Sequence, residues 1–126
     1  MRLKGIKKTI LIVDDEKEVR DLIHVTLHNP EYRILETGDG CSALELVRRE
    51  RPDLLMLDWM MPSMSGLEVA EALSSDPHTA DIPIIMLTAI GADKDRQRAY
   101  EMGILAYIVK PFSPLELRER VRTLLE

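Results

Sequence analysis

Four apolar runs of this 126-residue chain are each followed directly by polar or charged side chains. In chain order these side chains are Asp14-Asp15-Glu16, Asp58, Thr88 and Lys110. Three aspartates gathered in one place would repel one another unless a cation lay among them, and oxygen ligands of this kind suit Mg²⁺. A lysine can contact a phosphoryl oxygen, and a carboxylate can attack phosphorus. This set therefore favours phosphoryl transfer onto an aspartate.

These side chains can meet only if the strands that carry them lie side by side. Five apolar runs recur, at 10–13, 32–35, 54–57, 84–87 and 106–109. The first, third and fourth lack alternation, which predicts strands that are buried on both faces.

Helical spacing appears between and after the predicted strands. The apolar faces are Val19, Leu22, Ile23 and Leu27; Ala43, Leu44 and Val47; Leu67, Ala70 and Leu73; and Leu117, Val121 and Leu124. A more polar helix is expected from Arg96 to Met102, closed by Gly103 as a left-handed cap. The last helix has a clear start, because Ser113 can cap it and Pro114 suits its first turn.

Strict alternation of strand and helix predicts a doubly wound, five-stranded parallel sheet of the flavodoxin-like type, with strand order 2-1-3-4-5. In that order the first, third, fourth and fifth strands are neighbours. Their carboxyl ends then form one rim, which is where such sheets bind ligands. We expect residues 1–126 to form one domain, with its core at about 8–125 and no effector domain.

Composition excludes several classes of protein. The net charge is −5, from 17 Lys and Arg against 22 Asp and Glu, which is a poor match for nucleic acid. A single cysteine, Cys41, excludes an intrachain disulfide and is consistent with a reducing cytoplasm. The apolar runs are far shorter than the ~18–20 residues that span a bilayer, and the basic N-terminus is not followed by a signal-peptide core.

Four motifs together resemble the receiver domain of bacterial two-component response regulators, from about Lys8 to Leu125. They are Ile-Leu-Ile-Val-Asp-Asp-Glu at 10–16, Asp-Trp-Met-Met-Pro at 58–62 with Gly66 after it, Pro-Ile-Ile-Met-Leu-Thr-Ala at 83–89, and Tyr-Ile-Val-Lys-Pro-Phe at 107–112. The resemblance implies a cytoplasmic signalling module and not a conventional enzyme, because it would catalyse only its own phosphorylation and dephosphorylation.

The resemblance also implies a role for each site residue. Asp58 would accept a phosphoryl group from a sensor histidine kinase or a phosphotransfer protein. Mg²⁺, or Mn²⁺ in its place, would be bound by Asp15, Asp58 and the Met60 carbonyl, and by Asp14 through a water. Lys110, Thr88 and the Ala89 amide would contact phosphoryl oxygens, and the Lys110–Pro111 bond would be cis.

Tyr107 would be the aromatic switch that turns inward when Thr88 moves, and it would change the surface of the fourth helix, fifth strand and fifth helix. That surface would serve an unknown downstream effector protein or linked effector domain. The domain itself would bind neither nucleic acid nor membrane, and it would be a monomer or a phosphorylation-dependent dimer.

Two departures from the family pattern lead to hypotheses. An acidic pair used in some activated dimers is replaced by Ile104 and Leu105, so we expect apolar partner contacts there. Met60 and Ile90 are apolar where polar groups often align water, so we expect a relatively long-lived aspartyl phosphate.

Three alternatives remain. A degenerate receiver would bind partners without phosphorylation, although the complete set of site residues argues against it. A Mg²⁺-dependent phosphohydrolase of the haloacid dehalogenase type would need a second Asp two residues after its nucleophile, and Asp14 and Asp15 are adjacent. A flavodoxin-like cofactor binder would need a Gly/Ser/Thr-rich phosphate loop, which adjacent aspartates oppose.

Overall fold

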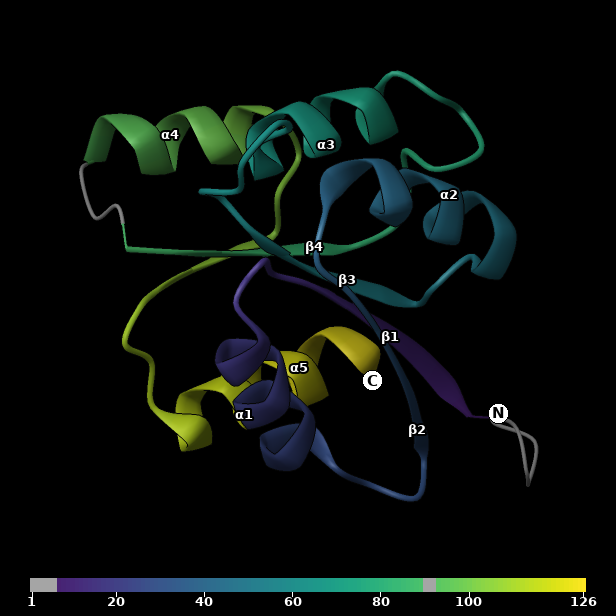
Figure 1. The fold of residues 1–126 in the computed structure, drawn as a ribbon, viewed down its shortest axis with the longest axis vertical. Helices are drawn as coiled ribbons and strands as arrows, with labels where there is room; N and C mark the ends of the chain where they lie inside the picture. Colours follow the sequence, from purple (N-terminus) through teal and green to yellow (C-terminus); the bar gives the residue numbers. More distant parts are fainter. Residues whose placement is uncertain (1–6, 90–92) are drawn as a thin grey trace.

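A computed structural model describes residues 7–89 and 93–126 as five strands and five helices in strict alternation (Figure 1). The strands are β1 (Lys8–Val13), β2 (Tyr32–Thr37), β3 (Leu54–Asp58), β4 (Ile84–Thr88) and β5 (Ala106–Val109). The helices are α1 (Lys17–Leu27), α2 (Gly40–Glu50), α3 (Gly66–Ser74), α4 (Asp93–Glu101) and α5 (Pro114–Leu125).

The strands form one parallel sheet in the order β2-β1-β3-β4-β5, which confirms the predicted fold class and topology. Helices α1 and α5 cover one face of the sheet, and α2, α3 and α4 cover the other (Figure 1). None of the helices in the described ranges combines the length and apolar character that spanning a bilayer requires.

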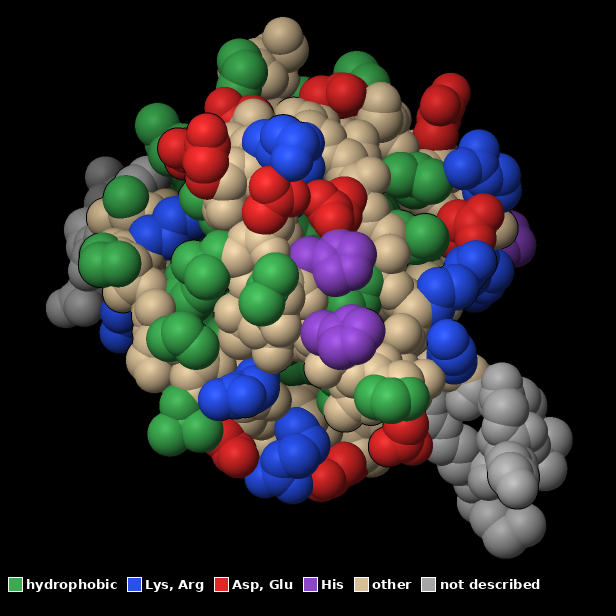
Figure 2. Space-filling model, turned by 60° about the horizontal axis from the view of Figure 1, so that its bottom comes forward, with side chains coloured by type: hydrophobic (Ala, Val, Ile, Leu, Met, Phe, Trp, Pro, Cys, Tyr) green, Lys and Arg blue, Asp and Glu red, His purple; other side chains and the backbone are tan. Residues whose placement is uncertain are grey.

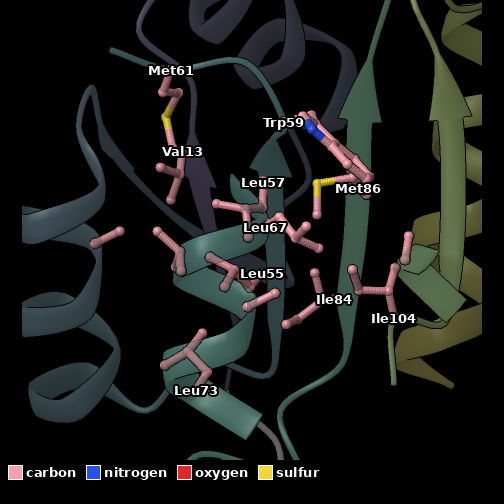
Figure 3. Close-up of a cluster of buried hydrophobic side chains, with 14 of the residues drawn as sticks. Val13, Leu55, Leu57, Trp59, Met61, Leu67, Leu73, Ile84, Met86 and Ile104 are labelled. Carbon is pink, nitrogen blue, oxygen red and sulfur yellow. The ribbon is translucent and has the colours of Figure 1, made fainter. Parts of the chain in front are cut away.

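Two cores lie on opposite faces of the sheet, because successive side chains of a strand point in opposite directions. Leu11 and Val13 of β1 belong to the core under α2 and α3, whereas Ile10 and Ile12 belong to the core under α1 and α5. Figure 3 shows the first of these, where Leu55 and Leu57 of β3 face Leu67 of α3. The continuous apolar runs of β1, β3 and β4 are explained by this burial on both sides.

The helix boundaries follow from their caps. Ser113 accepts a hydrogen bond from the Glu116 amide and Pro114 opens α5, as predicted. Gly103 has a φ of +87° after α4, which confirms the left-handed cap, since this conformation is strained for residues with a Cβ. Helix α4 begins at Asp93, three residues before its expected start at Arg96.

One predicted core position is wrong. Ile23 and Leu27 of α1 are buried, but Leu22 is 50% exposed. Adjacent residues lie about 100° apart around a helix, so the stripe that packs Ile23 and Leu27 onto the sheet turns Leu22 toward the edge of the contact.

Candidate functional site

The backbone continues the sheet's hydrogen bonding into the predicted site residues. The Trp59 amide donates to the Leu87 carbonyl at 2.9 Å, and the Lys110 amide donates to the Thr88 carbonyl at 2.7 Å. The Asp14 amide donates to the Thr37 carbonyl at 3.2 Å. The residues at the carboxyl ends of these strands are therefore held by the sheet, and a site built on a sheet is more rigid than one built on loops.

Lys110 joins two aspartates that are far apart in the sequence. Its Nζ lies 2.8 Å from Oδ2 of Asp14 and 3.3 Å from Oδ1 of Asp58. Asp14 is fully buried and Asp58 is 3% exposed. One ammonium group thus faces two buried carboxylates, and the three side chains carry a net charge of −1 when all are ionised.

This imbalance is reflected in the pKa values of the site. Burial and the negative charge of Asp14 raise the pKa of Asp58 to about 6, although Lys110 and the Met60 backbone amide partly oppose the rise. Burial lowers the pKa of Lys110, but its hydrogen bond to Asp14 and the two carboxylate charges outweigh burial and leave that pKa above its usual value. Lys110 therefore stays protonated at neutral pH.

A group of carboxylates suitable for a cation lies at the mouth of this site. One oxygen from each of Asp14, Asp15 and Glu16 lies within 4.8 Å of the other two, and Asp15 and Glu16 are exposed. All donors in this group are carboxylate oxygens, and the adjoining buried site has excess negative charge. These residues fit a hard divalent ion such as Mg²⁺, which prefers few protein ligands together with water.

Glu16 follows the first strand together with Asp14 and Asp15, and no role was predicted for it. Its position directly after Asp15 was the signal that could have identified it as a candidate ligand. Its backbone amide also donates to Oδ1 of Asp14 at 2.9 Å, which ties the turn to the site.

The remaining predicted residues lie at the same end of the sheet. Thr88 is buried at the end of β4, Ala89 follows it and is exposed, and the Lys110–Pro111 bond is cis as predicted. The Met60 side chain is 62% exposed. Ile90 lies outside the residues that the structure describes.

Tyr107 is buried against another aromatic ring. Its ring centroid lies 6.2 Å from that of Trp59 with an interplanar angle of 75°, and the Arg96 guanidinium carbon lies 5.2 Å from the Tyr107 centroid. Edge-to-face rings and a cation over a ring are both favourable arrangements. Tyr107 thus connects α4 to the residue that follows Asp58.

Gly66 allows the loop after Asp58 to pack closely against the backbone at the end of β3. Its amide donates to the Trp59 carbonyl at 2.9 Å. A Cβ at this position would lie 2.1 Å from the Asp58 carbonyl oxygen, so a larger residue would displace the backbone of the site.

Ile104 and Leu105 were both predicted to contact a partner, but one is buried and the other is exposed. Ile104 is 2% exposed and packs in the core, so the expectation of partner contact through it was wrong. Leu105 is 55% exposed, and its contact with a partner stays a prediction.

Comparisons of the sequence with known proteins all point to one family. The profile of the response regulator receiver domain matches residues 10–122. The phosphate regulon transcriptional regulatory protein PhoB of Pseudomonas aeruginosa is 46% identical over 120 residues, which is 95% of this chain and 52% of that protein. A probable transcriptional regulator, ycf27, of Cyanophora paradoxa is 44% identical over 94% of this chain and 48% of that protein. The chain thus spans about half the length of these curated relatives.

Solved structures agree with the fold. The chemotaxis protein CheY4 of Vibrio cholerae has a TM-score of 0.87 at 29% identity, over 94% of this chain and 99% of that one. The Francisella response regulator 1452 receiver domain has a TM-score of 0.87 at 28% identity, over 94% of this chain and 97% of that one.

Proposed function

This chain belongs to the response regulator receiver family, and from that premise we propose that Asp58 accepts a phosphoryl group in a Mg²⁺-dependent step. The observation that carries the proposal is the buried Asp58 at the end of β3, with Lys110 Nζ between it and Asp14. A nucleophile, a cation for phosphoryl oxygens and a carboxylate pair for a metal are all present there. We infer a signalling role, in which the chemistry acts on the domain itself.

The transfer needs an ionised Asp58. One of its oxygens forms a bond to phosphorus as the bond from phosphorus to the donor's leaving atom breaks, and the electron pair leaves with the donor. Because the pKa of Asp58 is about 6, the carboxylate is mostly ionised at neutral pH. Lys110 Nζ lies 3.3 Å from Oδ1 of Asp58, which supports its contact with an oxygen of the incoming group.

Asp15, Asp58 and the Met60 carbonyl would hold Mg²⁺, with Asp14 acting through a water. When bound, the ion supplies positive charge that offsets the charge on the phosphoryl oxygens. Without it, the extra negative charge would be added next to Asp14, which is buried and has one ammonium partner shared with Asp58.

Thr88 and the Ala89 amide would bind the other phosphoryl oxygens, and a shift of Thr88 would alter the packing around Tyr107. The ring of Tyr107 contacts both Trp59 and Arg96, which supports a path from the site to α4. The surface of α4, β5 and α5 would then present two arrangements to an effector. Leu105, which directly precedes β5, is apolar and exposed.

The phosphodonor would be a sensor histidine kinase or a phosphotransfer protein. A pocket of about 380 Å³ beside Lys110 supports this, because it is lined by apolar groups that include Leu22, Pro111 and Phe112. Leu22, exposed at the edge of α1, is available to such a partner. Since the curated relatives are transcriptional regulators about twice as long, we propose that the output is transcriptional and that nucleic acid contacts belong to an effector.

The first experiment is incubation of the chain with acetyl phosphate, with and without Mg²⁺, followed by intact mass measurement. We expect a Mg²⁺-dependent gain of one phosphoryl group that is lost in Asp58→Ala and kept in Asp21→Asn, a matched change of an exposed aspartate. A gain that survives in Asp58→Ala would exclude Asp58 as the acceptor. No gain, together with no beryllofluoride complex, would favour a degenerate receiver that only binds partners.

A further inference from the structure

All three oxygens of Asp14 accept hydrogen bonds. Oδ2 is bonded by Lys110 Nζ at 2.8 Å and Oδ1 by the Glu16 amide at 2.9 Å. The backbone carbonyl oxygen accepts from Nη1 of Arg20 at 2.7 Å. The first two donors belong to the site or to its own turn, but Arg20 reaches the site from the fourth residue of α1.

Arg20 is itself held from the other side by β2. Its Nε lies 3.4 Å from Oε1 of Glu36, whose Oε2 lies 2.6 Å from Nδ1 of His24. The Arg20 side chain is 19% exposed and that of Glu36 is 27% exposed. The planar guanidinium can donate in both directions at once, so it spans the gap between Glu36 and the Asp14 carbonyl.

The backbone after β2 leaves space for this arrangement. A Cβ at Gly38 would lie 3.2 Å from Nη1 of Arg20 and 3.8 Å from the Asp14 carbonyl oxygen. A side chain there would crowd the guanidinium. By contrast, Lys17 and Asp21 form an ion pair within α1 whose side chains are 74% and 55% exposed, and no bond joins this pair to the described residues of the site.

We propose that Arg20 is a positioning residue that fixes the peptide between Asp14 and Asp15 and so sets the arrangement of the carboxylates that bind Mg²⁺. The inference rests on the proposed function, because it assumes that those carboxylates take a metal. A charge-assisted bond to the Asp14 carbonyl holds the point from which Asp15 and Glu16 leave the sheet. Groups that orient metal ligands in this way commonly change metal affinity about 10- to 100-fold when removed.

The direction in which Mg²⁺ affinity changes in Arg20 variants distinguishes a positioning role from an effect of the charge. Arg20 carries a positive charge beside a cation site, so its electrostatic effect alone would oppose Mg²⁺ binding. If charge were its whole contribution, Arg20→Met would bind Mg²⁺ more tightly and Arg20→Lys would match the wild type. If Arg20 positions the turn, both variants bind Mg²⁺ more weakly, because a lysine keeps the charge but cannot donate as a fork.

The test is titration of Mg²⁺ into the metal-free full chain, followed by the fluorescence of Trp59, the residue after Asp58. We expect the dissociation constant to rise about tenfold in Arg20→Met and by a smaller factor in Arg20→Lys. Arg33→Met is the matched control, since it breaks another arginine–glutamate pair, with Glu50. We expect Arg33→Met to bind Mg²⁺ as the wild type does. Unchanged or tighter binding in Arg20→Met would overturn the proposal.

A second measurement needs no metal and detects the turn directly. The Glu16 amide bonds to Asp14, so its hydrogen exchange in metal-free protein reports how well the turn is held. We expect faster exchange in Arg20→Met than in Arg33→Met at matched global stability, and equal exchange would overturn the proposal. If the wild type shows no response to Mg²⁺ by fluorescence or calorimetry, the proposed metal function fails, and the role of Arg20 in metal binding is overturned with it.

Discussion

The two ends of the sheet hold charged side chains in different ways. At the amino end, Arg33 of β2 pairs with Glu50 at 2.5 Å, and Asp53 accepts the Thr9 amide at 2.7 Å. At the carboxyl end, Lys110 alone of the described cations is within ion-pair distance of Asp14 and Asp58. The Arg33 and Glu50 side chains are 48% and 25% exposed, whereas those of Asp14 and Asp58 are at most 5% exposed.

The difference supports the proposal that the functional site lies at the carboxyl end of the sheet. Water screens the Arg33–Glu50 pair at the amino end, and its two charges balance. The pair therefore changes the free energy of unfolding only slightly. The carboxyl end keeps an excess of negative charge away from water, which reduces stability unless a bound cation offsets it, and such an arrangement is typical of functional sites. Figure 2, in which the side with α1 and α5 comes forward, shows a solvated face of the molecule for comparison. Acidic, basic and apolar side chains are mixed on it.

The largest effect should follow from removing the shared cation. Lys110→Met leaves two buried carboxylates without their ammonium, so we expect the free energy of unfolding at pH 7.5 to fall by about 3 kcal/mol. The loss should shrink below pH 6, where Asp58 becomes protonated, and on addition of Mg²⁺. Urea denaturation measures it, with Lys17→Met as the control because Lys17 forms an exposed pair with Asp21. Equal losses in the two variants would contradict the contrast between the ends.

The next largest effect is a gain in the free energy of unfolding, not a loss. Because the pKa of Asp58 is raised from 3.8 to about 6 in the folded chain, the unfolded chain releases this proton first as pH rises. Stability therefore falls between about pH 4 and pH 6 and stays lower above that range. Asp58→Asn removes this cost, so we expect it to raise the free energy of unfolding at pH 7.5 by roughly 1 to 3 kcal/mol.

The gain from Asp58→Asn should disappear as pH approaches 4, where the wild-type carboxyl is also neutral. Denaturation of both proteins from pH 4 to pH 8 checks this sign. A gain that is constant across that range would mean that the side-chain charge is not its cause.

A kinetic effect should follow at Met60, the exposed apolar residue two positions after Asp58, the proposed phosphoacceptor. An amide there can align the water that attacks phosphorus, so we expect Met60→Asn to hydrolyse its aspartyl phosphate several-fold faster, which corresponds to about 1 kcal/mol. Decay of the phosphorylated mass over time measures it. Leu105→Asn is a matched change of an exposed apolar residue elsewhere, and an equal acceleration in that variant would exclude local water alignment.

The smallest effect should be at the amino end. Arg33→Met breaks the pair with Glu50, and we expect a loss of less than about 1 kcal/mol that becomes smaller in high salt. Denaturation at low and high ionic strength measures it. A loss as large as that of Lys110→Met would show that the two ends do not differ in the way that burial and charge balance imply.

Much of the fold could be predicted from local patterns. Runs such as 54–57 and 84–87 are apolar throughout because both faces of β3 and β4 are covered. Ser113 with Pro114, and Gly103, mark helix ends because they satisfy specific backbone needs that hold in almost any context. The early start of α4 was missed because its sequence is polar and has little apolar periodicity.

The orientation of neighbouring residues could not be predicted in the same way. Ile104 and Leu105 are equally apolar, and Leu22 and Ile23 are adjacent in one apolar helix face. Which of each pair is buried depends on where the adjoining helix crosses the sheet, and that is a property of packing. Arg20 is a similar case, because a guanidinium six residues after Asp14 has no local pattern that marks it as a contact of the Asp14 carbonyl.

Two features of this protein therefore have different origins. The order of strands and helices, and the presence of Asp14, Asp58, Thr88 and Lys110 at strand ends, follow from the sequence, because periodicity and chain connectivity leave few topologies. The tertiary structure alone decides that Lys110 Nζ is shared by two buried carboxylates and that the pKa of Asp58 rises to about 6. Desolvation and charge–charge distances depend on where side chains lie in space, and residues 14, 58 and 110 become neighbours only when the sheet has formed.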